Sequence, residues 1–330
     1  VIDCTGEGEV AFRAGAQTDE WSRDKLEPST VAFTADGINW DEFMEYFMNN
    51  LDEFDFNHVY EPYIDMNEDQ IRDMIRQNVK SIADVAEVMG FVSLHKKGVE
   101  TGEWHNKSGL GFFIMPREGG VIQAHFQHSS QVDNVDCCDV RDLTKCEVDC
   151  RAQDEIAFKF FKKYVPGFEN MYLTRVCPEV RIRETRRVMG DYILTTEDIA
   201  EARRFPDTIG RSNFPGGAKH VVPGADNTTT GTVTSSAINA VPKDGGSNDI
   251  PYRCLVPLGL ENFLVAGKAV SATRAAHQRF LQQTMVTGEA AGTAAALCVK
   301  KGITPRQLED EVSELQKVLV ERGAILFGTY

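Results

Sequence analysis

The chain has 330 residues, which is enough for two domains or one large one. Its hydrophobic share of 42% and charged share of 26% are typical of a globular protein, so we do not expect disorder. The formal net charge of -15 argues against nucleic acid or an anionic membrane as a partner. No run of about 18 apolar residues and no signal segment is found, so we expect a cytoplasmic protein that does not cross a membrane.

The first residues predict a short buried strand that leads through a glycine turn into a helix. VIDC is apolar, and TGEGE supplies the turn ahead of EVAFRAG. In nucleotide-binding folds such a unit can come late, after a glycine-rich segment that has already bound the phosphates. The opening therefore raises the question of where the first half of such a site lies.

Residues 20–130 combine predicted helices and strands. Residues 38–50 predict a helix with Phe43, Tyr46 and Phe47 on one face. Residues 67–91 predict a longer helix capped by Asn67. Residues 110–130 predict two strands joined at residues 117–120. We interpret this block as an α+β insertion.

The next segments predict a helix, an arginine-rich strand and a long loop. Residues 150–170 predict an amphipathic helix that ends at Pro166 and Gly167. Residues 178–205 predict a strand with alternating arginines, a turn at Gly190 and Asp191, and a short helix with Thr196 as N-cap. Residues 212–249 are rich in Gly, Ser, Thr, Asn and Pro, which is typical of a functional loop, a lid or a mobile connection.

The C-terminal part predicts a buried strand followed by two helices. ENFLVAGKAV is the strand, and TMVTGEAAGTAAALCVKKG is a helix of small residues. In the last helix Thr304 is the expected N-cap, Pro305 the first residue and Gln307 the partner in a capping box. Its predicted inward stripe and its end are formed by Leu308, Val312, Leu315, Leu319 and Gly323.

The cysteines and histidines do not predict a metal site. Four cysteines cluster in CCDVRDLTKCEVDC without paired CxxC spacing, namely Cys137, Cys138, Cys146 and Cys150. The other four are expected to be small buried hydrophobic residues, namely Cys4, Cys177, Cys254 and Cys298. His125 and His128 do not share a strand face, which makes a two-histidine metal site improbable, although one of them could line a substrate pocket.

Three separate segments lead from a strand or turn to a glycine at which backbone could approach a ligand closely. They are Thr5-Gly6, Gly267, and Gly288 with Gly292. A helix starting near Thr287 would direct free N–H groups toward an anionic ligand or a reduced flavin. Close packing of a helix on a sheet is the alternative interpretation of GEAAGTAAAL, and plain turns are the alternative for the single glycines.

Five stretches together resemble a family of FAD-dependent oxidoreductases. They are VIDCTGEGEVAFRAGA, VPGFENMYL, PEVRIRETRRVMGDYILTTEDI, DIPYRCLVPLGLENFLVAGKAVSAT and GEAAGTAAALCVKKGITPRQL. The family includes xanthan-lyase-like flavoproteins and is distantly similar to heterodisulfide reductase A subunits. The likeness covers most of residues 1–20 and 150–325, whereas residues 20–150 match poorly and are where substrate-specific structure is expected.

The resemblance implies an α/β fold with a Rossmann-like FAD-binding domain and an inserted α+β substrate domain. Residues 1–20 and 250–330 would belong to the FAD-binding domain, and residues 21–249 to the insertion. The family's N-terminal βαβ unit with GxGxxG is absent from this sequence, so the FAD-binding domain would be incomplete at its N-terminus. We expect a second chain, or an N-terminal segment lost or lying outside this sequence, to supply the ADP-binding unit.

The same resemblance implies which residues contact FAD. Thr5 and Gly6 would lie near the ADP portion, and Gly267 and Lys268 near the pyrophosphate or ribityl chain. The residues expected against the flavin ring are Thr287, Gly288, Glu289 and Ala290, with Gly292 in the same motif. A carboxylate beside a reduced flavin is unfavourable, so the Glu289 side chain should turn away.

Candidate catalytic residues are His277, Arg279 and Arg183. His277 could accept a substrate hydroxyl proton, since imidazole titrates near neutral pH. Arg279 could hold a carboxylate, a hydroxyl group or the flavin's pyrimidine edge. A packed, hydrogen-bonded histidine is the alternative for His277. For Arg181, Arg183, Arg186 and Arg187 the alternative is pairing with acids such as Glu184 and Asp191.

The leading hypothesis is an FAD-dependent oxidoreductase, or its catalytic subunit, that moves a hydride between a small polar organic substrate and flavin N5. Sugar-like alcohols are the favoured class. The alternatives are an electron-transfer or scaffold subunit of a multi-chain flavin and iron–sulfur complex, and a degenerate binding domain without a cofactor. We also expect an oligomer.

Overall fold

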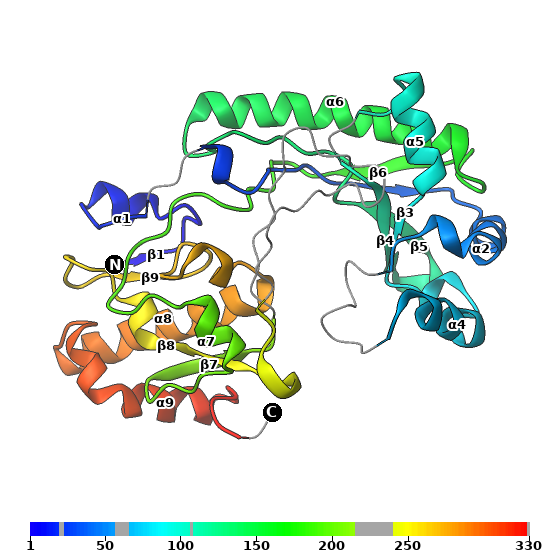
Figure 1. The fold of residues 1–330 in the computed structure, drawn as a ribbon. Coiled ribbons are helices and arrows are strands. Elements are labelled where there is room, and N and C mark those ends of the chain that lie inside the picture. Colours follow the sequence, from blue (N-terminus) through cyan, green and yellow to red (C-terminus); the bar gives the residue numbers. More distant parts are fainter. Residues whose placement is uncertain (20–22, 57–65, 106–107, 215–239, 329–330) are drawn as a thin grey trace. The chain divides into compact units, whose positions relative to one another are not determined.

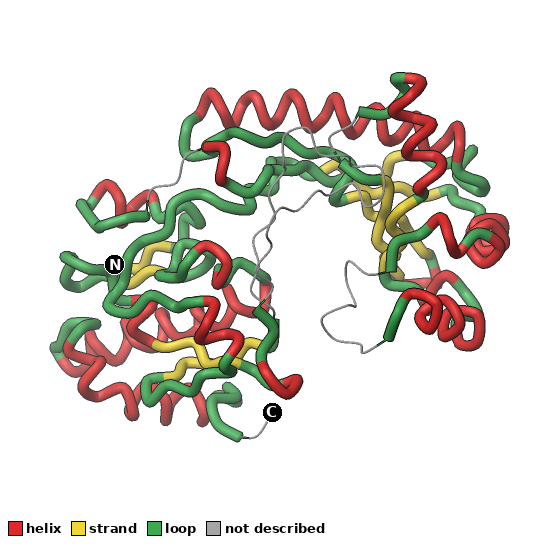
Figure 2. Tube along the Cα trace, in the orientation of Figure 1, coloured by secondary structure: helices red, strands yellow, loops and turns green. Residues whose placement is uncertain are grey.

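The computed structural model describes residues 1–19, 23–56, 66–105, 108–214 and 240–328 (Figure 1). The described residues form two compact units. Unit 1 contains residues 1–19, 184–214 and 240–328, and unit 2 contains residues 23–56, 66–105 and 108–183. Helices and strands occur in both units, so each is of mixed α and β composition (Figure 2).

Unit 2 is built on a five-stranded antiparallel sheet with the strand order β3-β4-β5-β2-β6. The strands are β2 (Phe33–Asp36), β3 (Glu87–Gly90), β4 (Leu110–Pro116), β5 (Ile122–Phe126) and β6 (Tyr172–Val176). The predicted hairpin is confirmed, because β4 and β5 pair around a turn in which Gly119 and Gly120 have positive φ. The sheet thus places side by side strands that are far apart in the sequence, such as β2 and β6.

One face of this sheet is covered by an aromatic core. Phe33 and Phe126 pair across β2 and β5 with ring centroids 4.4 Å apart. Phe161 of α6 (Val140–Tyr164) meets Phe126 edge to face at 4.9 Å. The remaining helices of unit 2 are α2 (Trp40–Asn49), α4 (Glu68–Asn78) and α5 (Val92–Thr101). Aromatic rings thus hold the helices to the sheet.

The helices predicted in unit 2 are present in the structure, but some of them begin or end at other residues than predicted. The helix over residues 38–50 is confirmed as α2, with Phe43 and Phe47 buried. α6 ends before Pro166 as predicted, but it begins at Val140 and so includes two cysteines of the cluster. Gly167 has a φ of +86°, and a Cβ there would lie 2.4 Å from the Asn39 carbonyl oxygen, so only glycine fits.

The helix predicted for residues 67–91 is much shorter in the structure. Asn67 is the N-cap as predicted and forms a capping box with Gln70, but α4 ends at Asn78. A 3-10 turn from Ile82 and strand β3 follow. The Asp84 carboxylate accepts hydrogen bonds from the N–H groups of Lys80 and Ser81, which starts a new turn where the helix was expected to continue.

Unit 1 contains two small sheets. β1 (Ile2–Asp3) pairs in parallel with β9 (Leu264–Val265), and β7 (Thr208–Ser212) pairs antiparallel with β8 (Asn248–Pro251). α8 (Leu281–Lys301) contacts both sheets. Its approach to β7 is close, since a Cβ on Gly210 would lie 2.5 Å from a Val286 methyl group. Its small residues Ala290, Ala291 and Ala294 are fully buried, which permits this close approach.

The other helices of unit 1 are short. They are α1 (Glu9–Arg13), α7 (Thr196–Ala200) and α9 (Val312–Glu321), the last preceded by a 3-10 turn over Gln307–Glu311. Thr304 and Gln307 exchange the predicted capping-box hydrogen bonds, of 2.8 and 3.2 Å. The predicted helix start at Pro305 is wrong, because the 3-10 turn begins at Gln307 and α9 only at Val312. Leu308, Leu315 and Leu319 of the predicted stripe are buried.

Two predictions for residues 178–205 are wrong. Arg181 and Val188 form only isolated bridges, and no strand runs between them, because these residues are held mainly by side-chain ion pairs. The N-cap of α7 is Thr195 rather than Thr196, because the Thr195 hydroxyl accepts from the Asp198 N–H. Of the predicted loop at residues 212–249, β7 and β8 take up the two ends, and residues 215–239 lie outside the described residues.

Candidate functional site

Two glycine turns meet where the parallel strands of unit 1 end. Ile2 pairs with Leu264 and Asp3 with Val265, so the carboxyl ends of β1 and β9 lie side by side. Gly6 and Lys268 follow these ends, and a Cβ on Gly6 would lie 3.2 Å from Lys268 Cε. The structure therefore brings together two predicted segments that are about 260 residues apart in the chain.

An ion pair and a buried carboxylate fix the first turn. Lys268 Nζ lies 2.5 Å from Glu7 Oε1. The Asp3 carboxylate accepts from the Thr5 N–H at 2.9 Å, the Thr5 hydroxyl at 2.7 Å and the Ala11 N–H at 2.8 Å. Burial raises the pKa of Asp3, but these hydrogen bonds outweigh burial and leave the pKa below its usual value. Asp3 and Glu7 were not predicted, although a carboxylate two residues before Thr-Gly is a readable signal for such a turn.

The third predicted segment joins the site through one hydrogen bond. The Gly267 N–H donates to Thr287 Oγ1 at 3.1 Å, and Thr287 is fully buried on α8. Gly267 has a φ of +84°, and a Cβ there would meet nothing within 4 Å. Gly288 is open in the same way. The backbone at both glycines thus borders free space, as the close approach of a ligand requires.

The helix start predicted near Thr287 is wrong. α8 begins at Leu281, where Gln283 Oε1 accepts from the Phe280 N–H at 3.2 Å. Residues 287–289 lie in the helix interior, where backbone N–H groups bond to carbonyls one turn earlier. They cannot donate to a ligand. Their contribution is open backbone surface at Gly288.

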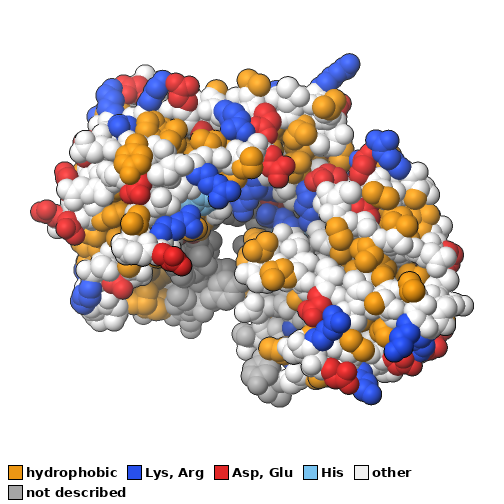
Figure 3. Space-filling model, turned by 180° about the vertical axis from the view of Figure 1, so that it is seen from behind, with side chains coloured by type: hydrophobic (Ala, Val, Ile, Leu, Met, Phe, Trp, Pro, Cys, Tyr) orange, Lys and Arg blue, Asp and Glu red, His pale blue; other side chains and the backbone are white. Residues whose placement is uncertain are grey.

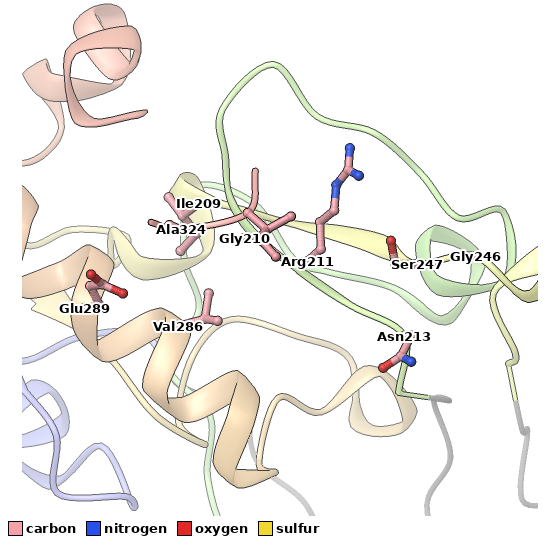
Figure 4. A pocket seen from close by; sticks show the side chains of 10 residues that line it. Ile209, Gly210, Arg211, Asn213, Gly246, Ser247, Val286, Glu289 and Ala324 are labelled. Atoms are coloured by element: carbon pink, nitrogen blue, oxygen red, sulfur yellow. The ribbon is translucent and has the colours of Figure 1, made fainter. Parts of the chain in front are cut away.

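Glu289 lies on the side of α8 opposite Thr287, because two residues correspond to about 200° of helix rotation. Its side chain lines a pocket of about 610 Å³ together with Val286 of α8 and residues of β7 (Figure 4). Arg211 on this pocket is 3.3 Å from Asp249 and donates to the Gly328 carbonyl at 2.8 Å. Glu289 is therefore directed away from the Gly267–Thr287 contact.

His277 and Arg279 lie together in the segment before α8. His277 is 8% exposed, and Arg279 Nε donates to His277 Nε2 at 3.4 Å. The Arg279 guanidinium lies 4.8 Å from the centre of the Phe280 ring. A basic group and a guanidinium are thus adjacent in unit 1, the unit that holds the glycine turns.

A buried ion network holds the chain just before His277. Glu184 accepts from Arg274 Nε at 2.8 Å and from Arg187 Nη1 at 2.9 Å. Arg187 also donates to Asp19 at 2.7 Å. The predicted pairing of Arg187 with Glu184 is confirmed, whereas Asp191 pairs with Arg306 instead.

Arg183, the third candidate catalytic residue, belongs to unit 2. Its Nη2 lies 2.9 Å from His128 Nδ1, and its side chain is nearly buried. It therefore belongs to a different compact unit from His277 and Arg279.

The cysteines are thiols with different exposures. Cys254 and Cys298 are buried as predicted, but Cys4 is exposed and Cys177 is half-buried. Cys137 and Cys146 are 3.8 Å apart at sulfur. Their hydrogen bond and burial raise the pKa of Cys146, and burial raises that of Cys150 to about 12. Across the described ranges, no group of three or more potential metal ligands is arranged to hold an ion.

Parallel strands that end in glycine turns beside a long helix are typical of α/β proteins that bind a dinucleotide cofactor. A family model described as FAD dependent oxidoreductase matches residues 1–319, so the chain belongs to this family. It is an FAD-dependent oxidoreductase, and FAD is its cofactor. The open backbone at Gly267 and Gly288 fits such a group. No curated protein and no solved structure shows a significant match.

Acidic, basic and hydrophobic side chains all occur on the face seen in Figure 3. Among the residues described, no helix is long and apolar enough to span a membrane. The family match favours the enzyme over the electron-transfer alternative.

Proposed function

We propose that the ends of β1 and β9, with the adjoining part of α8, hold FAD for hydride exchange with a small polar organic substrate, sugar-like alcohols being the favoured class. The hydrogen bond from Gly267 to Thr287 carries this proposal, because it joins the strand ends to the helix beside open backbone. FAD supplies hydride acceptance at N5. The residues of the chain bind it and orient the substrate.

The proposed FAD-binding residues differ in what they contribute. Thr5 and Gly6 border the ADP portion, and Gly267 and Lys268 the pyrophosphate or ribityl chain. Gly288 and Gly292 offer backbone without a side chain where the ring approaches. Thr287 and Ala290 are buried and support this surface from behind, while Glu289 stays turned away from it.

We propose that His277 accepts the hydroxyl proton of the substrate and that Arg279 orients the hydroxyl or a neighbouring polar group. The Arg279 N–H already reaches His277 Nε2, so the lone pair of this nitrogen is directed toward the guanidinium. A substrate hydroxyl would have to replace this hydrogen bond, donating its proton to His277 Nε2 while its oxygen accepts from Arg279. Arg183 is proposed to hold a polar group of the substrate.

We further propose that this Rossmann-like domain is incomplete and that another polypeptide segment completes it. Such a segment, on a second chain or N-terminal to this one, would carry the GxGxxG unit of the xanthan-lyase-like and heterodisulfide-reductase-like relatives. Among the described residues β1 pairs only with β9, which leaves a strand edge open. On α8, Leu281, Met285 and Val299 are 73%, 68% and 85% exposed, which suits a covering helix.

The proposed organisation follows from the same reasoning. Residues 1–20 and 250–330 would serve as the FAD-binding domain and residues 21–249 as the inserted substrate domain; the described residues 184–214 and 240–249 of this insertion belong to unit 1. The enzyme would be oligomeric and cytoplasmic. Intact-mass analysis of the purified assembly tests the second segment directly. A partner polypeptide with GxGxxG, or a longer chain that carries this unit ahead of the present residues, supports the proposal. Tight FAD binding by the 330 residues alone contradicts it.

Anaerobic flavin reduction tests the catalytic roles. The holoenzyme is mixed with a panel of sugar alcohols, and loss of flavin absorbance near 450 nm is followed. His277→Asn should keep FAD and slow reduction about 100-fold or more, because the proton acceptor is lost. Gln282→Asn, at an exposed position on α8, is the control and should reduce normally. Equal rates for His277→Asn and wild type would contradict the assignment.

A further inference from the structure

Two buried thiols of unit 2 lie in contact with each other. Cys137 stands in the segment before α6, and Cys146 lies on the helix itself. Their Sγ atoms are 3.8 Å apart, which is the distance of two atoms in contact. A disulfide bond joins sulfurs about 2.0 Å apart, so a shift of about 1 Å by each side chain would bring this pair to bonding distance.

Hydrogen bonds on both sides of Cys137 hold its segment against the start of α6. The Asp136 N–H donates to Asp142 Oδ2 at 2.8 Å, and Asp142 lies in the first turn of the helix. The Cys138 N–H donates to Asp136 Oδ1 at 3.0 Å, and the Asp139 N–H donates to the Asp136 carbonyl at 2.9 Å. The fold therefore keeps the sulfur of Cys137 close to the helix that carries Cys146.

A third buried thiol, Cys150, lies one turn further along α6. Its sulfur donates to the Ser29 carbonyl at 3.8 Å, and the Ser29 hydroxyl lies 3.3 Å from Cys137 Sγ. The sulfur–sulfur contact joins Cys137 to Cys146, so Cys146 rather than Cys150 is the partner that the structure assigns to Cys137.

The two thiols of the pair differ in accessibility. Cys137 is 7% exposed, whereas Cys146 is fully buried. The hydrogen bond with Cys137 and burial raise the pKa of Cys146, so its sulfur is a neutral thiol near neutral pH. An oxidant from solution therefore reaches Cys137 first, and Cys146 reacts second.

We propose that Cys137 and Cys146 are a redox-sensitive modification site, at which a peroxide drives formation of a reversible disulfide. Hydrogen peroxide first oxidises Cys137 Sγ by two electrons: a sulfur–oxygen bond forms, the oxygen–oxygen bond breaks, and one water leaves. Cys146 Sγ then bonds to Cys137 Sγ and displaces the hydroxyl group. This hydroxyl takes the thiol proton of Cys146 and leaves as a second water.

The new bond would close the loop between Cys137 and Cys146 at the start of α6. Closing a loop restricts the unfolded chain, which favours the folded state of the oxidised protein. Disulfides that form in a reducing compartment are usually transient and redox-sensing. Both cysteines belong to unit 2, so this inference goes beyond the proposed function and does not depend on it.

Peptide mapping of the holoenzyme tests the pair. The protein is treated with hydrogen peroxide, unfolded with an alkylating reagent present, and digested with trypsin without reduction. Trypsin cuts after Arg141 and Lys145, so a bond between Cys137 and Cys146 links two separate peptides. We expect these linked peptides after oxidation, and dithiothreitol should release them. Alkylated Cys137 and Cys146 in protein whose other cysteines are oxidised would overturn the proposal.

The neighbouring cysteines supply matched controls, because they lie in the same two peptides. Cys138→Ala and Cys150→Ala should keep the linked peptides, whereas Cys146→Ala should reduce their yield at least about tenfold. Linked peptides that persist in Cys146→Ala would refute the pairing. Fragment spectra of the linked wild-type peptides identify the bonded cysteines directly, so the test holds even if a variant does not fold. A bond from Cys138 or to Cys150 in these spectra would also refute it.

Discussion

The Gly267 N–H and the Thr287 hydroxyl form a 3.1 Å hydrogen bond between a strand end and the middle of a helix. The same hydroxyl lies within donating distance of the carbonyls of Gln283 and Thr284, at 3.2 and 3.1 Å. One buried side chain therefore sets the position of α8 relative to the turn after β9. The open surfaces of Gly267 and Gly288 depend on that position.

Replacing Thr287 by Val should destabilise the protein by about 0.5–1.5 kcal/mol, because the half-buried Gly267 N–H loses its acceptor while the side-chain shape is kept. Urea unfolding measures the change. Thr293→Val is the matched control on the same helix, since the buried Thr293 hydroxyl has no hydrogen-bond partner in the described part of the chain. It should be neutral or slightly stabilising. Equal losses in the two variants would count against the role of Thr287.

Local sequence signals predicted the elements of the fold better than their ends. Asn67 was predicted as the cap of a helix and is the N-cap of α4. Its end depends on the Asp84 carboxylate, which takes backbone donors after the helix. The start of α8 was missed because Phe280 stands where a Ser, Thr, Asp or Asn cap is usual.

Replacing Glu184 by Gln should cost about 3–5 kcal/mol of stability, because Arg274 and Arg187 are nearly buried and would lose their shared carboxylate. Chemical denaturation followed by circular dichroism gives the value. Glu155→Gln is the control: it breaks an exposed i,i+4 pair with Lys159 and should leave the unfolding midpoint within error. A midpoint for Glu184→Gln equal to wild type would show that the network is not needed for stability.

Asp154 should make stability fall as pH rises. Burial raises the pKa of this carboxyl to about 7, against 3.8 in the unfolded chain. The folded state therefore binds the proton more tightly than the unfolded chain does. Protonation of Asp154 stabilises the fold fully below about pH 4, and this stabilisation is lost as pH rises through about 7. Relative to wild type, Asp154→Asn should gain about 2–3 kcal/mol of stability between pH 5 and pH 7, at about 1.4 kcal/mol per pH unit. Thermal melts at several pH values test this, and a pH-independent difference between the two proteins would contradict it.

The glycines of the candidate site could be predicted from the sequence, whereas its ion pairs could not. Gly6 and Gly267 each follow a short apolar stretch, a pattern visible in the sequence itself. The contact of Glu184 with Arg274 joins residues 90 positions apart, and no local pattern marks such a pair. The helix dipole was assigned to the wrong residues because the true helix start lies six residues before Thr287.

The central claim is that FAD lies against the open backbone beside Gly267 and Gly288. Titration of FAD into apoprotein, followed by flavin fluorescence, tests it with Gly288→Leu and the control Ala296→Leu. Ala296 is exposed two turns further along α8, and a side chain at either position has room in the fold. Gly288→Leu should lose at least about tenfold in FAD affinity with its melting temperature kept, whereas Ala296→Leu should bind like wild type. Unchanged FAD binding by Gly288→Leu would contradict the account.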